Sequence, residues 1–325
     1  MKKAAKKAAL HGALAVSFGL LSAGSLSAQD IQIEGTKFVH PIVEKWIVEY
    51  KKENPNTRIS LQTGREAEGY AGVHVVFGAA ASGENADSKV IYVGRYALLP
   101  VSNPQNPLLE SAGKGLKKKD VVNLVFEKDI LDEDFDADEK PKYAATVYTR
   151  ESKAPTAIAL AGYFNRSPEK IRGKKVFGDE IYLLNAIRKD KTGVTFNTLN
   201  YVYDLQSRQL KSEISLLPLS LKSKQREALE SRDVDKVISL LEEAKIETIP
   251  VENFGLQIPA KYANSKEVAH FIRWVLSHGQ KFNHEYGFLN LDDKTASSQQ
   301  TQVEKLLAQS GDKDGVQLAA NRIEN

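Results

Sequence analysis

The chain has 325 residues, with 45 Lys and Arg, 42 Asp and Glu, and no cysteine. The absence of cysteine excludes disulfides, zinc–thiolate sites, thiol nucleophiles and the acylated cysteine that anchors a lipoprotein. The near balance of charges provides no basic surplus of the kind that nucleic-acid binding needs. These counts indicate a globular protein long enough for two domains of about 150 residues each.

The first 28 residues have the layout of a secretory signal peptide. Lys2, Lys3, Lys6 and Lys7 precede an apolar stretch, and small residues follow up to Ala28. An uncleaved membrane anchor is the alternative, but the apolar stretch is short and interrupted. We therefore expect cleavage near residue 28 and a periplasmic protein. Loss of the four lysines leaves 41 basic against 42 acidic residues.

The next segment predicts a strand–helix–strand unit. Residues 31–35 and 57–62 have the alternation of short strands, and Pro41 opens a helical pattern between them. One face of this helix is apolar: Val43, Trp46, Ile47 and Tyr50. Such a unit has a parallel sheet and a right-handed crossover. Two further strands are predicted at 73–78 and 90–104.

The rest of the chain continues as alternating helices and strands. The predicted elements are a charged helix and loop over 114–138, a strand at 142–150, helices at 155–165 and 179–189, a strand at 193–198, a helix around 234–241, a helix at 265–278 capped by Asn264 and Glu267, and one short helix around 303–307. This order predicts an α/β protein with mixed sheets and two lobes.

Two strand-to-helix turns, residues 35–38 and residues 150–156, carry residues suited to an anion. In the second, Arg150 ends a strand and Thr156 lies in the first turn of the next helix. A guanidinium and the free N–H groups of a helix start both favour negative charge. Two alternatives stay open: Arg150 pairs structurally with Glu151 or Asp179, and Thr156 only caps its helix. The first turn spans residues 35–38, at the end of the first strand.

Five stretches follow one another along the chain: GTKFVHPIVEKW, VFGAAAS, ALLPVSNPQNPL, TRESKAPT and FIRWVLSHGQKFNHEYGFLNL. In their order and spacing they resemble the phosphate-binding-protein family, the periplasmic receptors of phosphate ABC transporters. The resemblance implies a two-lobed periplasmic binding protein fold (type II), with mixed sheets flanked by helices and a ligand cleft between the lobes. The implied division is 1–28 signal peptide, 29–100 plus 201–309 first lobe, 101–200 second lobe and 310–325 flexible tail.

The resemblance also implies which residues bind the anion. The candidates are Thr36, Lys37, Phe38, Arg150 and Thr156, with Ser82 and Ser152 as weaker ones. Lys37, which stands where the family has a hydroxyl residue, is equally well interpreted as a solvated lysine.

Other positions depart from the family pattern. Ala154 and Pro155 replace a Ser-Gly pair, which removes a hydroxyl and an N–H donor. Ala81 stands about where the family has the aspartate that accepts the proton of phosphate. Discrimination of phosphate from sulfate is therefore expected to be weak.

The expected function is periplasmic binding of phosphate or a similar oxyanion for transport. The resemblance implies delivery of this ligand to the membrane component of an ABC transporter. A monomer without cofactor, metal or nucleic acid is expected, and the absence of a visible nucleophile–base pair argues against an enzyme. The alternative is a binding-protein fold kept as an adaptor with a decayed anion site. The substitutions favour the adaptor, whereas Arg150 and Thr156 disfavour it.

Overall fold

The computed structural model describes residues 31–63, 73–77, 88–128 and 143–310. The predicted signal peptide, Ala81, Ser82 and the tail beyond Ser310 lie outside the described residues. Within these ranges a single large sheet is built from β1 (Ile31–Glu34), β2 (Ile59–Leu61), β3 (Val73–Phe77), β4 (Lys89–Ser102), β5 (Thr146–Arg150), β6 (Lys174–Val176), β7 (Gly193–Thr198), β10 (Ser215–Leu216) and β11 (Val251–Ile258). Its order is β2-β1-β3-β11-β4-β7-β5-β6, with β10 beside β4.

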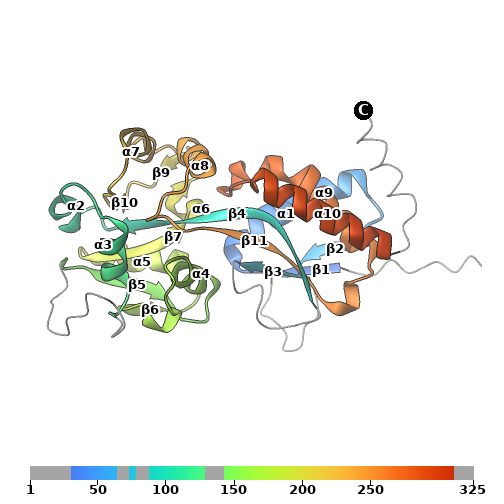
Figure 1. The fold of residues 1–325 in the computed structure, drawn as a ribbon, viewed down its shortest axis with the longest axis horizontal. Helices are drawn as coiled ribbons and strands as arrows, with labels where there is room; N and C mark the ends of the chain where they lie inside the picture. The colour runs from blue at the N-terminus through green and yellow to red at the C-terminus, as the bar shows by residue number, and fades with distance from the viewer. Residues whose placement is uncertain (1–30, 64–72, 78–87, 129–142, 311–325) are drawn as a thin grey trace, which may run out of the picture.

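The main helices cover the two ends of this sheet (Figure 1). At the end with β1 and β2 lie α1 (His40–Glu53), α9 (Lys266–Ser277) and α10 (Asp293–Gln309). At the other end lie α2 (Leu108–Ser111), α3 (Lys118–Val125), α4 (Pro155–Tyr163), α5 (Ile181–Lys189), α6 (Leu199–Val202), α7 (Ser223–Glu230) and α8 (Val234–Glu243), with the small hairpin of β8 (Tyr203–Asp204) and β9 (Gln209–Leu210).

The predicted strand–helix–strand unit is present. β1 pairs in parallel with β2 on one side and with β3 on the other. The apolar face of α1 is buried as expected, because a stripe at helical spacing can turn every large side chain towards the core. Trp46 is fully buried, stacks on Phe254 at 6.1 Å between ring centres, and donates a hydrogen bond to the Gly279 carbonyl at 3.1 Å.

Strands β4 and β11 connect the two ends of the molecule (Figure 1). Residues Lys89 to Ala97 of β4 pair antiparallel with β11, and the last five residues of β4 pair with β7. The sequence patterns predicted β4 but not β11. A period of two in Phe254, Leu256 and Ile258, all buried, is the signal that could have revealed it.

The division of the chain into lobes stays a prediction. Figure 1 bears on the boundary at which the second lobe ends and the chain returns to the first lobe. The segment from α6 to α8 lies at the end of the molecule that holds α2 to α5, not beside α1 and α9. β11 then leads the chain back to β3. We therefore propose that the second lobe extends to about residue 250, so that the chain returns to the first lobe through β11.

Three predicted details differ from the structure. The cap of α9 is Ser265, whose hydroxyl accepts from the Val268 N–H, rather than Asn264. α10 has 17 residues instead of the one short helix expected, because Gln299 is buried and accepts a hydrogen bond from the Tyr92 N–H across the sheet edge. The strand expected at 142–150 begins only at Thr146. No helix among the described residues is long and apolar enough to cross a membrane.

Candidate functional site

Arg150 is the last residue of β5, between β6 and β7, and the residue is buried (7 % exposed). The chain turns through residues 151–154 and enters α4 at Pro155, where the fixed φ of proline suits the first helical position. The Arg150 Nε donates to the Val176 carbonyl of β6 at 3.0 Å. The guanidinium is thereby fixed at the carboxyl end of parallel strands, where α/β proteins bind ligands.

Two carboxylates pair with the terminal nitrogens of Arg150. Its Nη2 lies 3.1 Å from Glu151 Oε1, and its Nη1 lies 3.1 Å from Glu180 Oε1. The same Glu180 oxygen accepts a hydrogen bond from the Thr156 hydroxyl at 3.2 Å. The structural alternative for Arg150 is confirmed for Glu151, and Glu180 takes the place expected of its neighbour Asp179. An arginine and a hydroxyl at a helix start thus hold one anionic oxygen from within the chain.

Glu180 is nearly inaccessible, at 3 % exposure, and this burial raises the pKa of its carboxyl group. Arg150 acts in the opposite direction and favours the charged form, as does the Thr156 hydroxyl, whereas the nearby Asp179 favours the protonated form. Ionisation of the Glu180 carboxylate therefore costs more free energy than ionisation of an exposed glutamate, even with Arg150 and Thr156 as its partners.

This raised pKa predicts a pH-dependent stability. An acid whose pKa is higher in the folded protein stabilises the fold fully below its ordinary pKa, and this contribution is lost as pH rises through the folded value. Compared with Glu180→Gln, the wild type should therefore gain free energy of unfolding as pH falls from 7 towards about 4.5. Urea unfolding of both proteins across this range measures the difference, and a difference that does not change with pH would contradict the prediction.

The first turn, residues 35–38, is connected to the region around Glu180 by a hydrogen bond to its backbone. Thr36 precedes a short 3-10 helix, Lys37–Val39, which leads directly into α1. The Thr36 hydroxyl oxygen is buried and has no hydrogen-bond partner among the described residues. Lys37 is exposed, and Phe38 is buried against the rings of Tyr96 and Phe288, at 5.9 and 6.2 Å between centres. The Phe38 side chain is therefore part of the core.

A series of hydrogen bonds links the two turns. The Asn200 side chain donates to the Phe38 carbonyl at 2.7 Å and accepts from the Thr198 hydroxyl at 2.6 Å. Thr198 in turn donates its N–H to Asn197, whose amide donates to the Glu180 carbonyl at 2.8 Å. These residues and Glu180 were not predicted from the sequence, although polar residues directly after the buried strand β7 were a usable signal.

The predicted site residues are only partly brought together. Arg150 and Thr156 meet at Glu180, while Thr36 to Phe38 connect to them through Asn200. Ser152 is half-buried in the turn before α4. The cavity that Arg150 and Thr156 line has a volume of only about 10 Å³, too little for more than one water molecule. A phosphate in that cavity would need these side chains to move.

No family model and no curated protein matches this sequence. Solved structures do match. A phosphate ABC transporter substrate-binding protein from Clostridium perfringens, described as putative and solved with bound phosphate, is 13 % identical, with a TM-score of 0.52; the match covers 81 % of this chain and 100 % of that one. An ABC-type phosphate transport receptor from Vibrio cholerae is also 13 % identical, with the same coverage and a TM-score of 0.53.

The chain has the type II periplasmic binding protein fold. The fold resemblance inferred from sequence is confirmed by these matches, which extend over the full length of the matched proteins. At 13 % identity they establish the fold alone. The fold by itself does not identify a ligand or an activity, because one fold supports many unrelated functions.

Proposed function

We propose that this protein is a non-catalytic periplasmic binding protein for a small oxyanion such as phosphate. The supporting observation is the donor pair of Arg150 and Thr156, which already holds the oxygen of an anionic group at 3.1 and 3.2 Å. Arginine has a planar fork that matches the oxygens of carboxylate and phosphate alike. A ligand oxyanion takes the position of the Glu180 carboxylate when that side chain turns away.

The first turn supports the same proposal. The buried Thr36 hydroxyl, which has no hydrogen-bond partner in the described segments of the chain, is the kind of group that a ligand oxygen or a bound water satisfies. The Asn200 link to Phe38 holds this turn in a defined relation to Glu180. Export and delivery to an ABC transporter membrane component, as a monomer, belong to this proposal. Export is supported by the signal-like N-terminus, and delivery is supported by the resemblance.

Two observations favour the second candidate, an adaptor with a decayed anion site. Glu180 is a fixed negative charge at the position where the ligand charge would lie, and a free oxyanion must displace it. Pro155 at the start of α4 also lacks the N–H that a helix start offers to an anion. In this case the Arg150–Glu180 pair has only a structural role.

Removal of the internal carboxylate separates the two candidates. Glu180→Gln deletes the competing negative charge and keeps a similar shape, so phosphate affinity is expected to rise at least about tenfold, equivalent to about 1.4 kcal/mol. Calorimetric titration of phosphate and sulfate into phosphate-free protein measures this. With no aspartate at position 81 to accept an anion proton, the two anions should differ by less than about tenfold.

Asp179→Asn is the matched control. Asp179 is the neighbouring carboxylate, and it accepts the Ile181 N–H at the start of α5 instead of pairing with Arg150. Its substitution should leave anion affinity within a factor of about two of the wild type. If neither the wild type nor Glu180→Gln binds phosphate or sulfate, the oxyanion proposal is wrong and the adaptor is the better interpretation.

A further inference from the structure

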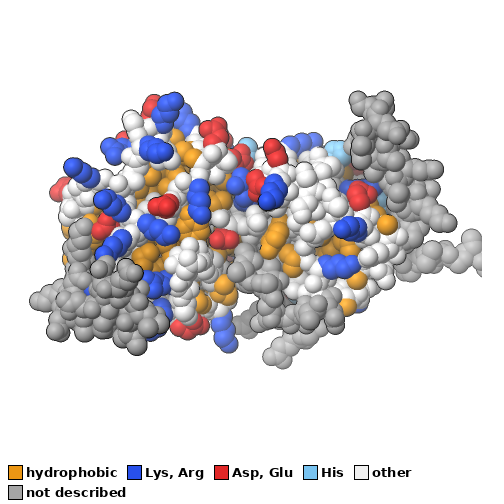
Figure 2. Space-filling view, in the orientation of Figure 1, with side chains coloured by type: hydrophobic (Ala, Val, Ile, Leu, Met, Phe, Trp, Pro, Cys, Tyr) orange, Lys and Arg blue, Asp and Glu red, His pale blue; other side chains and the backbone are white. Residues whose placement is uncertain are grey.

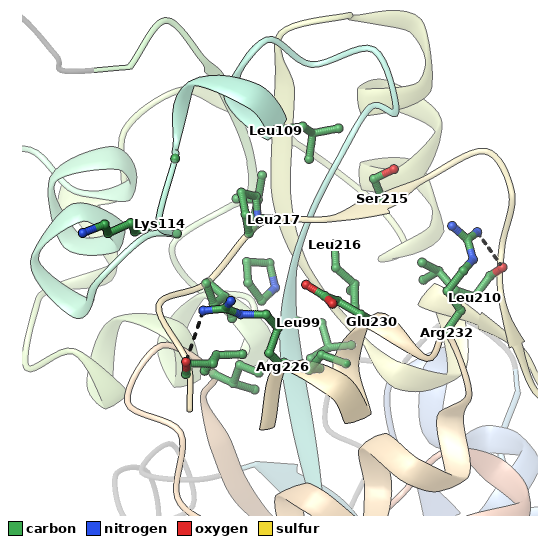
Figure 3. Close-up of a pocket in the computed structure, with 18 residues that line it drawn as sticks. Leu99, Leu109, Lys114, Leu210, Ser215, Leu216, Leu217, Arg226, Glu230 and Arg232 are labelled. Carbon is green, nitrogen blue, oxygen red and sulfur yellow. Dashed lines mark hydrogen bonds between the residues drawn. The ribbon is translucent and has the colours of Figure 1, made fainter. Parts of the chain in front are cut away.

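A separate cavity of about 410 Å³ lies in the region of the molecule built by α2, β10 and α7 (Figure 3). Its size falls in the range of small-molecule sites, roughly 300–1,000 Å³. Eight leucines, two prolines and an isoleucine form most of its wall. None of the predicted anion-site residues lines it, so it is independent of the site around Arg150.

The backbone holds this apolar wall in place. β10 pairs antiparallel with β4, so that Leu216 lies opposite Val101, and the Leu217 N–H donates to the Pro100 carbonyl at 2.9 Å. Gly115 has a φ of +91°, and a Cβ there would lie 2.4 Å from the Leu219 carbonyl carbon. The close approach of these two segments therefore requires glycine, and it closes one side of the cavity.

The cavity stays open to solvent beside its apolar wall. Leu216 and Leu221 are partly exposed, whereas Leu217, Leu219 and Leu229 are buried. Figure 2 shows hydrophobic side chains gathered at the surface of this end of the molecule, with Lys and Arg side chains around them. A mostly apolar recess with a few polar groups at its edge is the usual composition of a small-molecule site.

Charged residues lie at the edge of the cavity and are mostly basic. Lys114, Arg226 and Arg232 line it, against the single acid Glu230. In Figure 3 Arg226 and Glu230 extend from α7 towards the leucines. Arg226 is exposed, and among the described residues its guanidinium makes one long hydrogen bond, 3.4 Å to the Leu221 carbonyl. It retains donors for a ligand.

Arg232 adds a second feature to the edge. It follows the end of α7 with a φ of +60°, a left-handed conformation that usually selects glycine or asparagine at this position. Its guanidinium donates to the Leu210 carbonyl at 3.4 Å, on the opposite side of the cavity from Lys114 (Figure 3). Arg232 therefore lies at the cavity although its left-handed backbone conformation is unfavourable for arginine.

We propose that this cavity binds an amphiphile with a linear apolar chain and a carboxylate head, such as a fatty acid. The leucine wall accommodates the chain, and Arg226 provides a charge-assisted partner for the head, with the net positive edge favouring the anion. A phosphate ion is a poorer ligand because it has no apolar surface to bury against the leucines. A cationic amphiphile is also disfavoured, because Lys114, Arg226 and Arg232 repel its charge. The proposal does not depend on the function of the Arg150 site.

Dodecanoate is the test ligand, titrated calorimetrically below the concentration at which it forms micelles. Wild type is expected to bind it, and Arg226→Ala to bind it roughly tenfold more weakly through loss of the charged partner. Leu216→Asp, which places a like charge in the partly exposed wall, should abolish binding. Lys224→Ala is the matched control, because Lys224 lies on the same helix but does not line this cavity.

Further measurements separate this site from the other one and from charge alone. Saturating phosphate should not displace dodecanoate, and Glu180→Gln should bind it as the wild type does. Dodecylamine, with the same chain and the opposite charge, should bind at least about tenfold more weakly. Circular dichroism melting confirms that each variant is folded. The proposal is overturned if wild type does not bind dodecanoate, if Arg226→Ala and Lys224→Ala bind it equally, or if dodecylamine binds as well.

Discussion

Arg150→Ala is expected to lower the free energy of unfolding by about 3–5 kcal/mol, the range for breaking one side of a buried ion pair. The substitution leaves the Glu180 carboxylate buried at 3 % exposure with the Thr156 hydroxyl as its side-chain partner. It also removes the hydrogen bond to the Val176 carbonyl that ties β5 to the end of β6. Urea unfolding at neutral pH measures the loss.

The double variant Arg150→Ala/Glu180→Gln tests the cause of this loss. If the uncompensated charge of Glu180 is responsible, the neutral amide should recover a large share of the stability, because neighbouring substitutions of this kind are not additive. The single variant should also regain stability at lower pH, where Glu180 takes up its proton. Equal losses in the single and double variants would show that Arg150 contributes through packing and the Val176 hydrogen bond instead.

This expected loss affects how ligand binding is tested. Loss of phosphate binding in Arg150→Ala would not by itself identify a ligand role, because the same substitution also lowers the stability of the fold. Glu180→Gln changes the same site without leaving a buried charge unpaired. It is therefore the sharper probe of whether the two donors that hold Glu180 can hold an external anion.

Phe38→Ala is expected to destabilise the protein by about 3–5 kcal/mol, as other buried Phe-to-Ala substitutions do. The Phe38 ring is 1 % exposed and contacts the rings of Tyr96 and Phe288 below the first turn. Its removal leaves a cavity beside β4, the strand that joins the two ends of the sheet. Thermal and urea unfolding of the variant measure the effect.

Phe38→Leu is the control for a role in binding. It keeps more of the buried volume than alanine does and should therefore cost less stability than Phe38→Ala. If the turn serves an anion through its backbone N–H groups, Phe38→Leu should bind phosphate as tightly as the parent protein. A Phe38→Leu protein that is stable but has lost phosphate binding would instead show that the aromatic ring itself contributes to the site.

Local patterns determined much of the fold class. The apolar face of α1 from Val43 to Tyr50 could be predicted directly. Residues three or four apart in a helix lie on the same face, and this depends only on local geometry. The strands β1 and β2 on either side of it, and the parallel pairing that this connection demands, followed from the same logic. The positions of Arg150 and Thr156 at a strand end and a helix start were also predictable.

Contacts between distant segments could not be predicted in this way. β11 pairs with both β3 and β4, and the placement of the segment from α6 to α8 depends on where β11 turns back, which no local pattern specifies. The length of α10 depends likewise on Gln299 reaching the Tyr92 N–H, 207 residues away in sequence. Propensity alone favours a shorter helix there, since its first half is polar.

The state of the candidate site was decided by tertiary structure alone. The sequence determined that an arginine and a threonine lie at a turn suited to an anion, since both follow from the strand and helix boundaries. It could not determine that Glu180, 30 residues after Arg150, would supply that anion. The pairing arises because β6 lies in parallel register beside β5, with Arg150 opposite Val176, and the chain then turns Glu180 at the start of α5 towards the guanidinium. Burial makes the partner obligatory, because an isolated charge in that position would be too costly to keep.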